Sequence, residues 1–123
     1  MRDRLAEFEF DQQNGILVAT VSGEVDSSNA GELGLALSDR LPSAANALIL
    51  DLSAVSYLDS SGIALLFDLG RRLGARRQTM RLVVPPEAPM RRMLELCDVA
   101  VVAPIDAKLA DSLEAVSEAA DQG

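Results

Sequence analysis

Residues 48–66 read LILDLSAVSYLDSSGIALL, and this segment joins a strand pattern to a helix pattern. Residues 47–52 are almost continuously apolar, as expected for a strand covered on both faces of a sheet. A short turn is predicted to follow. The apolar spacing after Asp59-Ser60-Ser61-Gly62 predicts a helix from about Ser60 to Gly74, with Gly74 as its C-terminal stop. The segment would then bring two serine hydroxyls to the first turn of a helix.

The first turn of a helix is a favourable place for negative charge. Its N–H groups have no acceptors within the helix, and the helix dipole adds a positive potential. A serine in this turn can therefore carry a phosphate group without disrupting the helix. The segment favours a serine that acts as a switch over a serine that acts as a catalytic nucleophile.

A projection of the predicted helix separates the two serines, because each residue of an α-helix turns by about 100°. With Ile63 at zero, the apolar side chains occupy an arc from about 240° through zero to 40°. Ser61 projects at about 160°, among polar residues, and Ser60 at about 60°, beside the apolar arc. We expect Asp59 or Ser60 to cap the helix and Ser61 to face solvent.

Three further residues belong to the outward face in this projection. Asp68 and Arg72 fall in the polar arc, and Leu65, at about 200°, is a candidate apolar contact beside Ser61. The simpler alternative is that both serines only cap the helix, since capping serines are common. The wider pattern of the chain decides between the two interpretations.

The flanking sequence alternates between strand and helix patterns. Asn14-Gly15 lies between two strand patterns and predicts a β-hairpin. Asn29 and Glu32 have the spacing of a capping box for a helix ended by Pro42. Further elements are predicted as a strand at 80–84, a helix from about Pro89, a short edge strand at 100–103 and a final helix after Asp106.

This alternation predicts an α/β fold: a single domain with a mixed β-sheet of about five strands, opened by a β-hairpin, and about four α-helices. The domain would span residues 1–123, with its core at about 7–118 and short tails at residues 1–5 and 119–123.

Composition excludes several classes of protein. The 123 residues are 49% apolar and carry a net charge of −8, which argues against nucleic acid or an anionic membrane as the main partner. No apolar run approaches the roughly 20 residues of a membrane span. The single cysteine, Cys97, excludes an internal disulfide and is expected to pack in the core on the apolar face of a helix. We expect a soluble, cytoplasmic protein.

Seven arginines lie between Arg71 and Arg92 with one acid, Glu87, so this stretch carries +6 and the rest of the chain −14. Solvated helix faces are the favoured interpretation, because charge runs usually face water. A patch for an acidic partner is the alternative.

The residues for most catalytic chemistry are missing. The chain has no histidine, which excludes histidine general bases and histidine–metal sites. Asp26, Asp51 and Asp59 could form a carboxylate metal cluster, but cap and turn roles explain them more simply. We expect a protein that is not an enzyme and that has no cofactor or metal.

Three pairs of segments share the spacing of a known family. They are Gly23-Glu24-Val25-Asp26 with Asn29-Ala30, Asp51-Leu52-Ser53 with Asp59-Ser60-Ser61-Gly62, and Leu82-Val83-Val84 with Met90 to Leu96. Together they cover about residues 7–118 and resemble the STAS domain of the anti-sigma factor antagonist family. The second pair is the most specific, because Asp-Ser-Ser-Gly follows Asp-Leu-Ser at the family's interval.

The resemblance implies a function in partner switching. The unphosphorylated protein would bind an anti-sigma factor that is also a serine kinase and so free its sigma factor. The kinase would phosphorylate Ser61, the second serine of the motif, and a serine phosphatase would reverse this. No nucleic acid contact and no membrane insertion are expected. The expected partner-binding residues are Asp26, Asp59, Ser60, Ser61, Gly62, Leu65, Asp68 and Arg72.

The chain departs from the family pattern at two places. Asp98 stands where the family often has glycine, in a turn that needs a left-handed residue, which Asp tolerates better than most. The usual glycine-rich loop before the fourth strand is replaced by Arg76-Arg77-Gln78-Thr79.

Two other functions stay open. The domain could be a non-catalytic accessory or scaffold subunit, for example of a transporter ATPase or a stress-signalling complex. Relatives of the transporter kind tend to lack a phosphorylatable residue at the second serine position, so Ser61 counts against this. Alternatively, an α/β enzyme or ligand-binding protein could hold a nucleotide at the start of this helix, but such sites have a glycine-rich turn and only Gly62 is present.

Overall fold

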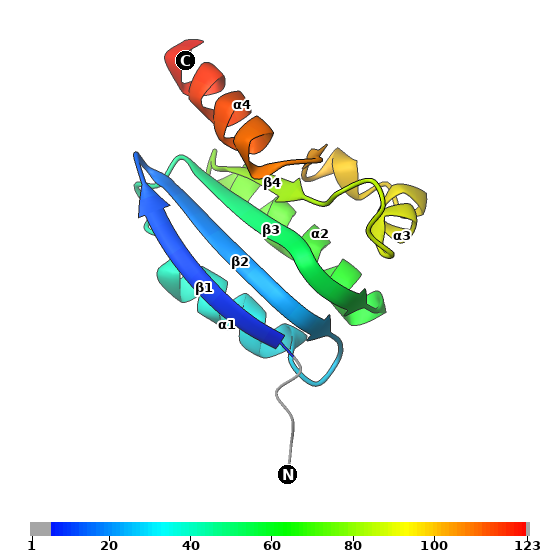
Figure 1. The fold of residues 1–123 in the computed structure, drawn as a ribbon. Coiled ribbons are helices and arrows are strands. Elements are labelled where there is room, and N and C mark those ends of the chain that lie inside the picture. The colour runs from blue at the N-terminus through cyan, green and yellow to red at the C-terminus, as the bar shows by residue number, and fades with distance from the viewer. Residues whose placement is uncertain (1–5, 123) are drawn as a thin grey trace.

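A five-stranded mixed sheet forms the centre of the computed structural model, which describes residues 6–122 (Figure 1). The first two strands are antiparallel and all other neighbours are parallel. The predicted mixed sheet opened by a hairpin is confirmed. In both chain order and spatial order the strands are β1 (Ala6–Gln13), β2 (Ile16–Val25), β3 (Ala47–Leu58), β4 (Thr79–Val83) and β5 (Ile105–Asp106).

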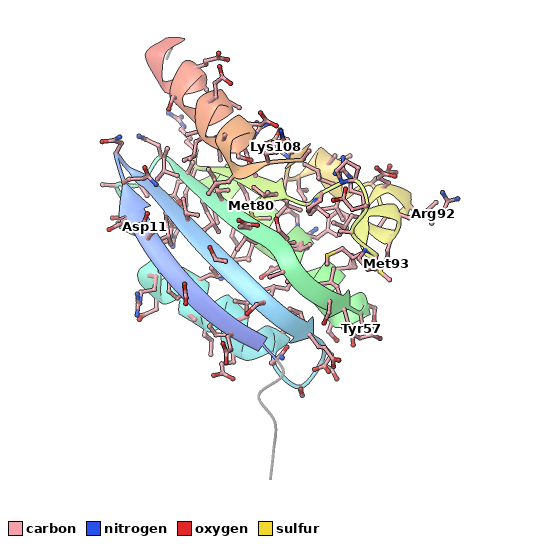
Figure 2. All side chains as sticks on the ribbon, in the orientation of Figure 1. Asp11, Tyr57, Met80, Arg92, Met93 and Lys108 are labelled. Atoms are coloured by element: carbon pink, nitrogen blue, oxygen red, sulfur yellow. The ribbon has the colours of Figure 1, made fainter. Side chains whose placement is uncertain are left out.

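Four α-helices pack on the two faces of the sheet. Helices α1 and α2 cover one face, where the larger apolar cluster lies, and α4 lies against the other face at one end (Figure 1). The side chains of Figure 2 fill the space between these layers, with Met80 only 2% exposed. The helices are α1 (Ala30–Arg40), α2 (Ser60–Ala75), α3 (Arg91–Leu96) and α4 (Leu109–Gln122).

The predicted tails have different outcomes. Residues 1–5 and 123 lie outside the described part of the chain. Residues 119–122 are not a tail, because α4 continues to Gln122. No helix within residues 6–122 is long and apolar enough to cross a membrane.

The hairpin turn has the backbone that its sequence predicts. Asn14 and Gly15 both have positive φ, 52° and 79°, as a two-residue type I′ turn requires. A side chain at Gly15 would also collide with Asn46, since its Cβ would lie 2.8 Å from Asn46 Nδ2. Gly15 is therefore needed both for its conformation and for space.

Strand β3 is longer than the sequence predicted. The short turn expected after residue 52 is absent, and β3 continues to Leu58, opposite Val25 of β2. The strand persists because β2 continues to Val25 and offers a partner as far as Leu58, with register shifts near Ser22 and Glu24. Asp59 therefore follows directly from a paired strand.

The predicted capping box of α1 is wrong. Asn29 reaches backward instead of capping: its Oδ1 accepts the N–H of Asp26 at 3.0 Å, and its Nδ2 donates to the carbonyl of Glu24 at 2.8 Å. The Asp26 carbonyl accepts the N–H groups of Asn29 and Ala30. Glu32 is exposed. The buried Asn29 thus stabilises the turn between β2 and α1 instead of the helix itself.

The end of α2 also differs from expectation. Gly74 lies inside the helix, and Arg77 takes the left-handed conformation, with a φ of 61°. The N–H of Gln78 donates to the carbonyl of Leu73, and that of Arg77 donates to Gly74. These two bonds form a Schellman motif in which arginine occupies the usual glycine position.

The segment after α3 corrects two expectations. Residues 99–101 form a 3₁₀ turn, and the edge strand is Ile105–Asp106 instead of residues 100–103. Cys97 is exposed, not in the core, because α3 ends at Leu96 and the helical spacing no longer applies. Asp98 does adopt the left-handed conformation that the family's glycine position requires.

An ion pair joins the last strand and helix to the sheet. The Asp106 carboxylate accepts from Arg81 Nε at 2.8 Å and from the buried Ser112 hydroxyl at 2.6 Å. The Arg81 and Asp106 side chains are only 20% and 17% exposed. The Arg81 hydrogen bond is the main reason that the pKa of Asp106 is lowered, against the opposing effect of burial.

This arrangement predicts an acid-sensitive contribution to stability. Because the pKa of Asp106 is lower in the folded state, its contribution is complete above the unfolded pKa of about 3.9 and disappears as pH falls through the folded pKa. Asp106→Asn should reduce the free energy of unfolding by about 1–3 kcal/mol near neutral pH. Urea unfolding from pH 7 to pH 3 should show this difference shrinking below about pH 4. Asp39→Asn, at an exposed carboxylate of α1, is the control, and an equal loss in both variants at pH 7 would contradict the prediction.

Candidate functional site

The start of α2 and the turn between β2 and α1 lie together at the carboxyl edge of the parallel strands. The backbone N–H of Asp59 donates to the carbonyl of Val25 at 3.2 Å, which ties the two segments directly. Tyr57, which is 51% exposed, marks this edge in Figure 2. The turn at Asp26 and the DSSG segment, which both contain expected partner-binding residues, therefore lie next to each other.

Asp59 is the N-cap of α2, as expected. Its Oδ1 accepts the N–H of Ser61 at 2.8 Å and that of Gly62 at 3.3 Å. Its carbonyl accepts the N–H of Ile63, the first bond within the helix. Two donors of the first turn are therefore already satisfied by a carboxylate of the chain.

Gly62 is required by close packing. It is buried, and a Cβ on it would lie 2.5 Å from Leu58 Cδ1 and 3.3 Å from Val25 Cγ1. Gly62 therefore lets the first turn of α2 settle onto the ends of β2 and β3. It is buried and supports the site from below, and its expected place among the partner-binding residues stays a prediction.

The exposure of the two serines is the reverse of the prediction. Ser60 is exposed, and Ser61 is only partly exposed. The projection considered the helix alone, whereas the end of β2 also packs against this turn of α2. Neither hydroxyl hydrogen bonds a residue within 6–122, so both oxygens are chemically available.

Asp26 forms a rigid turn beside the serines. Its Oδ1 accepts from the Ser28 hydroxyl at 2.6 Å and from the Ser28 N–H at 2.9 Å. These bonds, the hydroxyl bond first, lower the pKa of Asp26. With Asp59 capping α2, two carboxylates border the serine site.

The other three residues expected on the outward face of α2, Leu65, Asp68 and Arg72, have different surroundings. Leu65 is partly buried and packs toward α1, where a Cβ on Gly34 would lie 2.9 Å from its Cδ1, so it is not a free apolar contact. Asp68 is exposed and pairs with Arg72 at 3.0 Å. Arg72 also donates to Ser38 of α1 at 3.4 Å. It lies about 16 Å along the helix from Ser61, too far to belong to one compact site with it.

One exposed residue of this face was missed from the sequence. Ala64 follows Ser61 by three residues, on the same side of α2, and is exposed. Its projection at about 100° lay within the polar arc, so the signal was present, but an alanine has no chemistry that would attract notice.

The three aspartates considered for a metal cluster have separate local roles. Asp26 bonds Ser28, Asp51 bonds the N–H and hydroxyl of Ser53, and Asp59 caps α2. Within residues 6–122, no group of three His, Cys, Asp or Glu side chains could hold a metal ion. The predicted turn role of Asp26 and cap role of Asp59 are confirmed, whereas Asp51 lies inside β3 and bonds Ser53 of the same strand.

Comparisons with known proteins agree with this geometry. The family model of the STAS domain matches residues 7–114. A crystal structure of an anti-sigma factor antagonist from Mycobacterium paratuberculosis is 30% identical, covers 91% of this chain and 94% of its own, and superposes with a TM-score of 0.81. The anti-sigma-F factor antagonist RsfB of Mycobacterium tuberculosis is 34% identical over 61 residues, half of either chain.

A more distant structure shares the fold. The phosphorylated form of the Bacillus cell fate determinant SpoIIAA is 21% identical, covers 89% of this chain and 99% of its own, and superposes with a TM-score of 0.66. The match to the family model and the likeness of the mycobacterial structure together show that this chain belongs to the STAS domain family.

Proposed function

We propose that this protein is an anti-sigma factor antagonist that is controlled by phosphorylation of Ser61. The unphosphorylated protein binds an anti-sigma factor with serine kinase activity and releases its sigma factor. The kinase then phosphorylates Ser61 and loses affinity for the product, and a serine phosphatase restores the binding form. The protein itself performs no catalysis and acts in the cytoplasm.

The observation that carries this proposal is the unpartnered Ser61 hydroxyl beside a helix cap that is already complete. Asp59 accepts the Ser61 N–H at 2.8 Å, so the backbone under the serine is fixed while its side chain is available. A kinase needs an accessible hydroxyl on a backbone that it can hold in one geometry. The names of the mycobacterial relatives support the partner class.

Phosphorylation would change the surface more than the fold. A phosphoserine adds about −1.5 to −2 charges. The N–H groups of Ser61 and Gly62 already donate to Asp59, so they do not draw the phosphate inward. The new charge would stay at the surface beside Asp26 and Asp59, and this enlarged acidic surface would repel an acidic partner group and desolvate poorly.

The proposed interface differs from the set of partner-binding residues that was expected from the sequence, because it leaves out Arg72. It comprises the turn at Asp26, the exposed Ser60, the switch residue Ser61, and Ala64 and Asp68 on the next turns of α2. Leu65 supports it from inside, between α1 and α2. The exposed Ala64 has a small side chain that leaves room for a partner side chain, and a bulky charged residue there would prevent close contact.

The site of modification can be tested with two alanine variants. The protein is used as bait to recover its anti-sigma factor, and the recovered kinase is incubated with ATP and wild type, Ser60→Ala or Ser61→Ala. We expect one added phosphate on wild type and Ser60→Ala and none on Ser61→Ala, by intact mass and fragment analysis. Since Ser60 is the more exposed serine, a phosphate that remains on Ser61→Ala and disappears from Ser60→Ala would overturn the assignment.

The location of the interface can be tested by the same substitution at two ends of α2. Ala64→Arg should weaken binding to the anti-sigma factor at least tenfold, or about 1.4 kcal/mol, because the larger charged side chain blocks close contact. Ala75→Arg, also exposed but in the last turn, should bind as wild type. Ser61→Asp should weaken binding only in part, since it adds one charge. Titration calorimetry measures all three, and equal affinities for Ala64→Arg and Ala75→Arg would move the interface away from the start of α2.

A further inference from the structure

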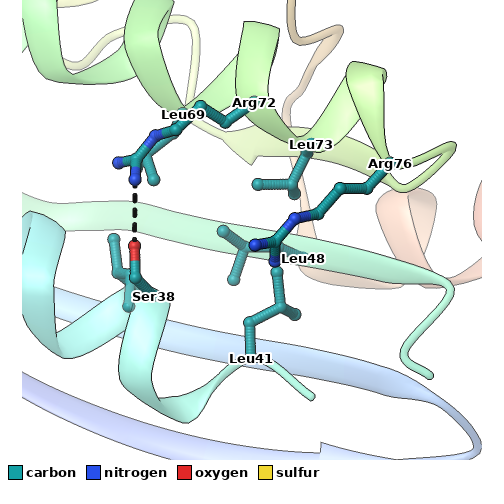
Figure 3. A pocket seen from close by; sticks show the side chains of 8 residues that line it. Ser38, Leu41, Leu48, Leu69, Arg72, Leu73 and Arg76 are labelled. Carbon is teal, nitrogen blue, oxygen red and sulfur yellow. Dashed lines mark hydrogen bonds between the residues drawn. The ribbon is translucent and has the colours of Figure 1, made fainter. Parts of the chain in front are cut away.

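A cavity of about 90 Å³ lies between α1 and α2, at the end of these helices away from Ser61 (Figure 3). Its walls and floor are apolar. They are formed by Leu37 and Leu41 at the end of α1, Leu48 of β3, and Leu69 and Leu73 of α2. Each of these five side chains is at least nine-tenths buried, so the cavity reaches into the core of the domain.

The spacing of the two helices accounts for this cavity. The helices approach closely at Gly34 of α1 and Leu65 of α2, where a Cβ on Gly34 would lie only 2.9 Å from Leu65 Cδ1. One to two turns further along, the leucine side chains do not fill the space between the helices. Interiors are normally packed with few voids larger than a water molecule, so a cavity of this size is a distinct feature.

The size of the cavity limits what it can hold. A dry cavity of about 150 Å³ accommodates benzene, with six carbons, so 90 Å³ suits an apolar group of about four carbons. A butyl or isobutyl group meets this limit, and a long acyl chain does not.

The mouth of the cavity is positively charged. Figure 3 shows the side chains of Arg72 and Arg76 reaching over the leucines from α2. Arg72 bonds Ser38 across the mouth and pairs with Asp68. Arg76 forms no ion pair or hydrogen bond through its side chain with any residue from 6 to 122, so its five donors are available for a planar anion.

The mouth of the cavity is a positively charged site on a protein that is negatively charged overall, so it is a preferred place for an anion. The protein carries −8 overall, which disfavours anions near most of its surface. At the mouth itself two arginines, Arg72 and Arg76, stand beside the single acidic side chain of Asp68, which pairs with Arg72. The arginine-rich stretch thus has part of its positive charge at this cavity between α1 and α2.

We propose that this cavity binds a small aliphatic carboxylate, with about four carbons in the cavity and the carboxylate on Arg76. Bidentate hydrogen bonds from the guanidinium would fix the acid group, and burial of the chain would supply apolar contact. The two arginines of the site lie about 16 to 22 Å along α2 from Ser61, and the site does not depend on the proposed switch function.

The test is a titration of the full chain with pentanoate, followed by amide chemical shifts in NMR spectra. We expect saturable shifts at Ser38, Leu41 and Leu73. Acetate, which has the charge without the chain, and pentan-1-ol, which has the chain without the charge, should each bind at least tenfold more weakly, as expected when a charged hydrogen bond or most of the buried chain is lost.

Two variants and a matched control separate binding from nonspecific attraction. Arg76→Gln should weaken pentanoate binding about tenfold, the usual value of a hydrogen bond to a charged group. Ser38→Leu should block the mouth from the exposed surface without disturbing the core. Arg71→Gln removes an exposed arginine of α2 that does not line the cavity, and it should bind as wild type.

Three results would overturn the proposal. They are the absence of saturable shifts with pentanoate, equal binding of pentanoate and pentan-1-ol, and equal loss of affinity in Arg76→Gln and Arg71→Gln. Because none of these measurements involves Ser61 or an anti-sigma factor, they leave the proposed function untouched.

Discussion

The junction at Asp59 is the constraint on which the candidate site depends. Its N–H donates to Val25 at the end of β2, its carboxylate takes two N–H groups of α2, and its carbonyl accepts the first bond within that helix. One residue therefore joins two strands and a helix, and Gly62 provides the space for their close approach. All of these bonds hold backbone atoms, so the serine hydroxyls are placed precisely without using bonds of their own.

A complete cap also determines how added charge can act. At a helix start with open N–H groups, a phosphate would turn inward and much of its charge would be neutralised. Here the Asp59 carboxylate occupies the donors of Ser61 and Gly62. A phosphate on Ser61 would therefore remain at the surface near two carboxylates. A partner that reads this surface would respond to charge and desolvation, and the domain would not need to change its fold.

The sequence was sufficient for the features that follow from local chemistry. Asn14-Gly15 specified its turn, the apolar spacing of α2 specified its buried face, and Asp59 was identified as a cap. The errors came from long-range contacts. The length of β3 depends on β2 as its partner, Asn29 bonds backward to Glu24, and Leu65 packs on Gly34 of another helix. The predicted order of exposure of Ser60 and Ser61 was wrong for the same reason, because the projection of a single helix takes no account of neighbouring segments such as the end of β2.

Helix α2 has an acidic N-cap, Asp59, and a basic last turn that contains Arg72, which is the arrangement that its own dipole favours. The same charges give its two ends different binding preferences. Ser61 and the two arginines at the mouth of the cavity are about 16 to 22 Å apart along the helix, at least twice the Debye length of about 8 Å at physiological ionic strength. A phosphate at one end and a carboxylate at the other would hardly affect each other through space. Any coupling between them would have to pass through the protein itself, along α2 and its close contact with α1 at Gly34 and Leu65.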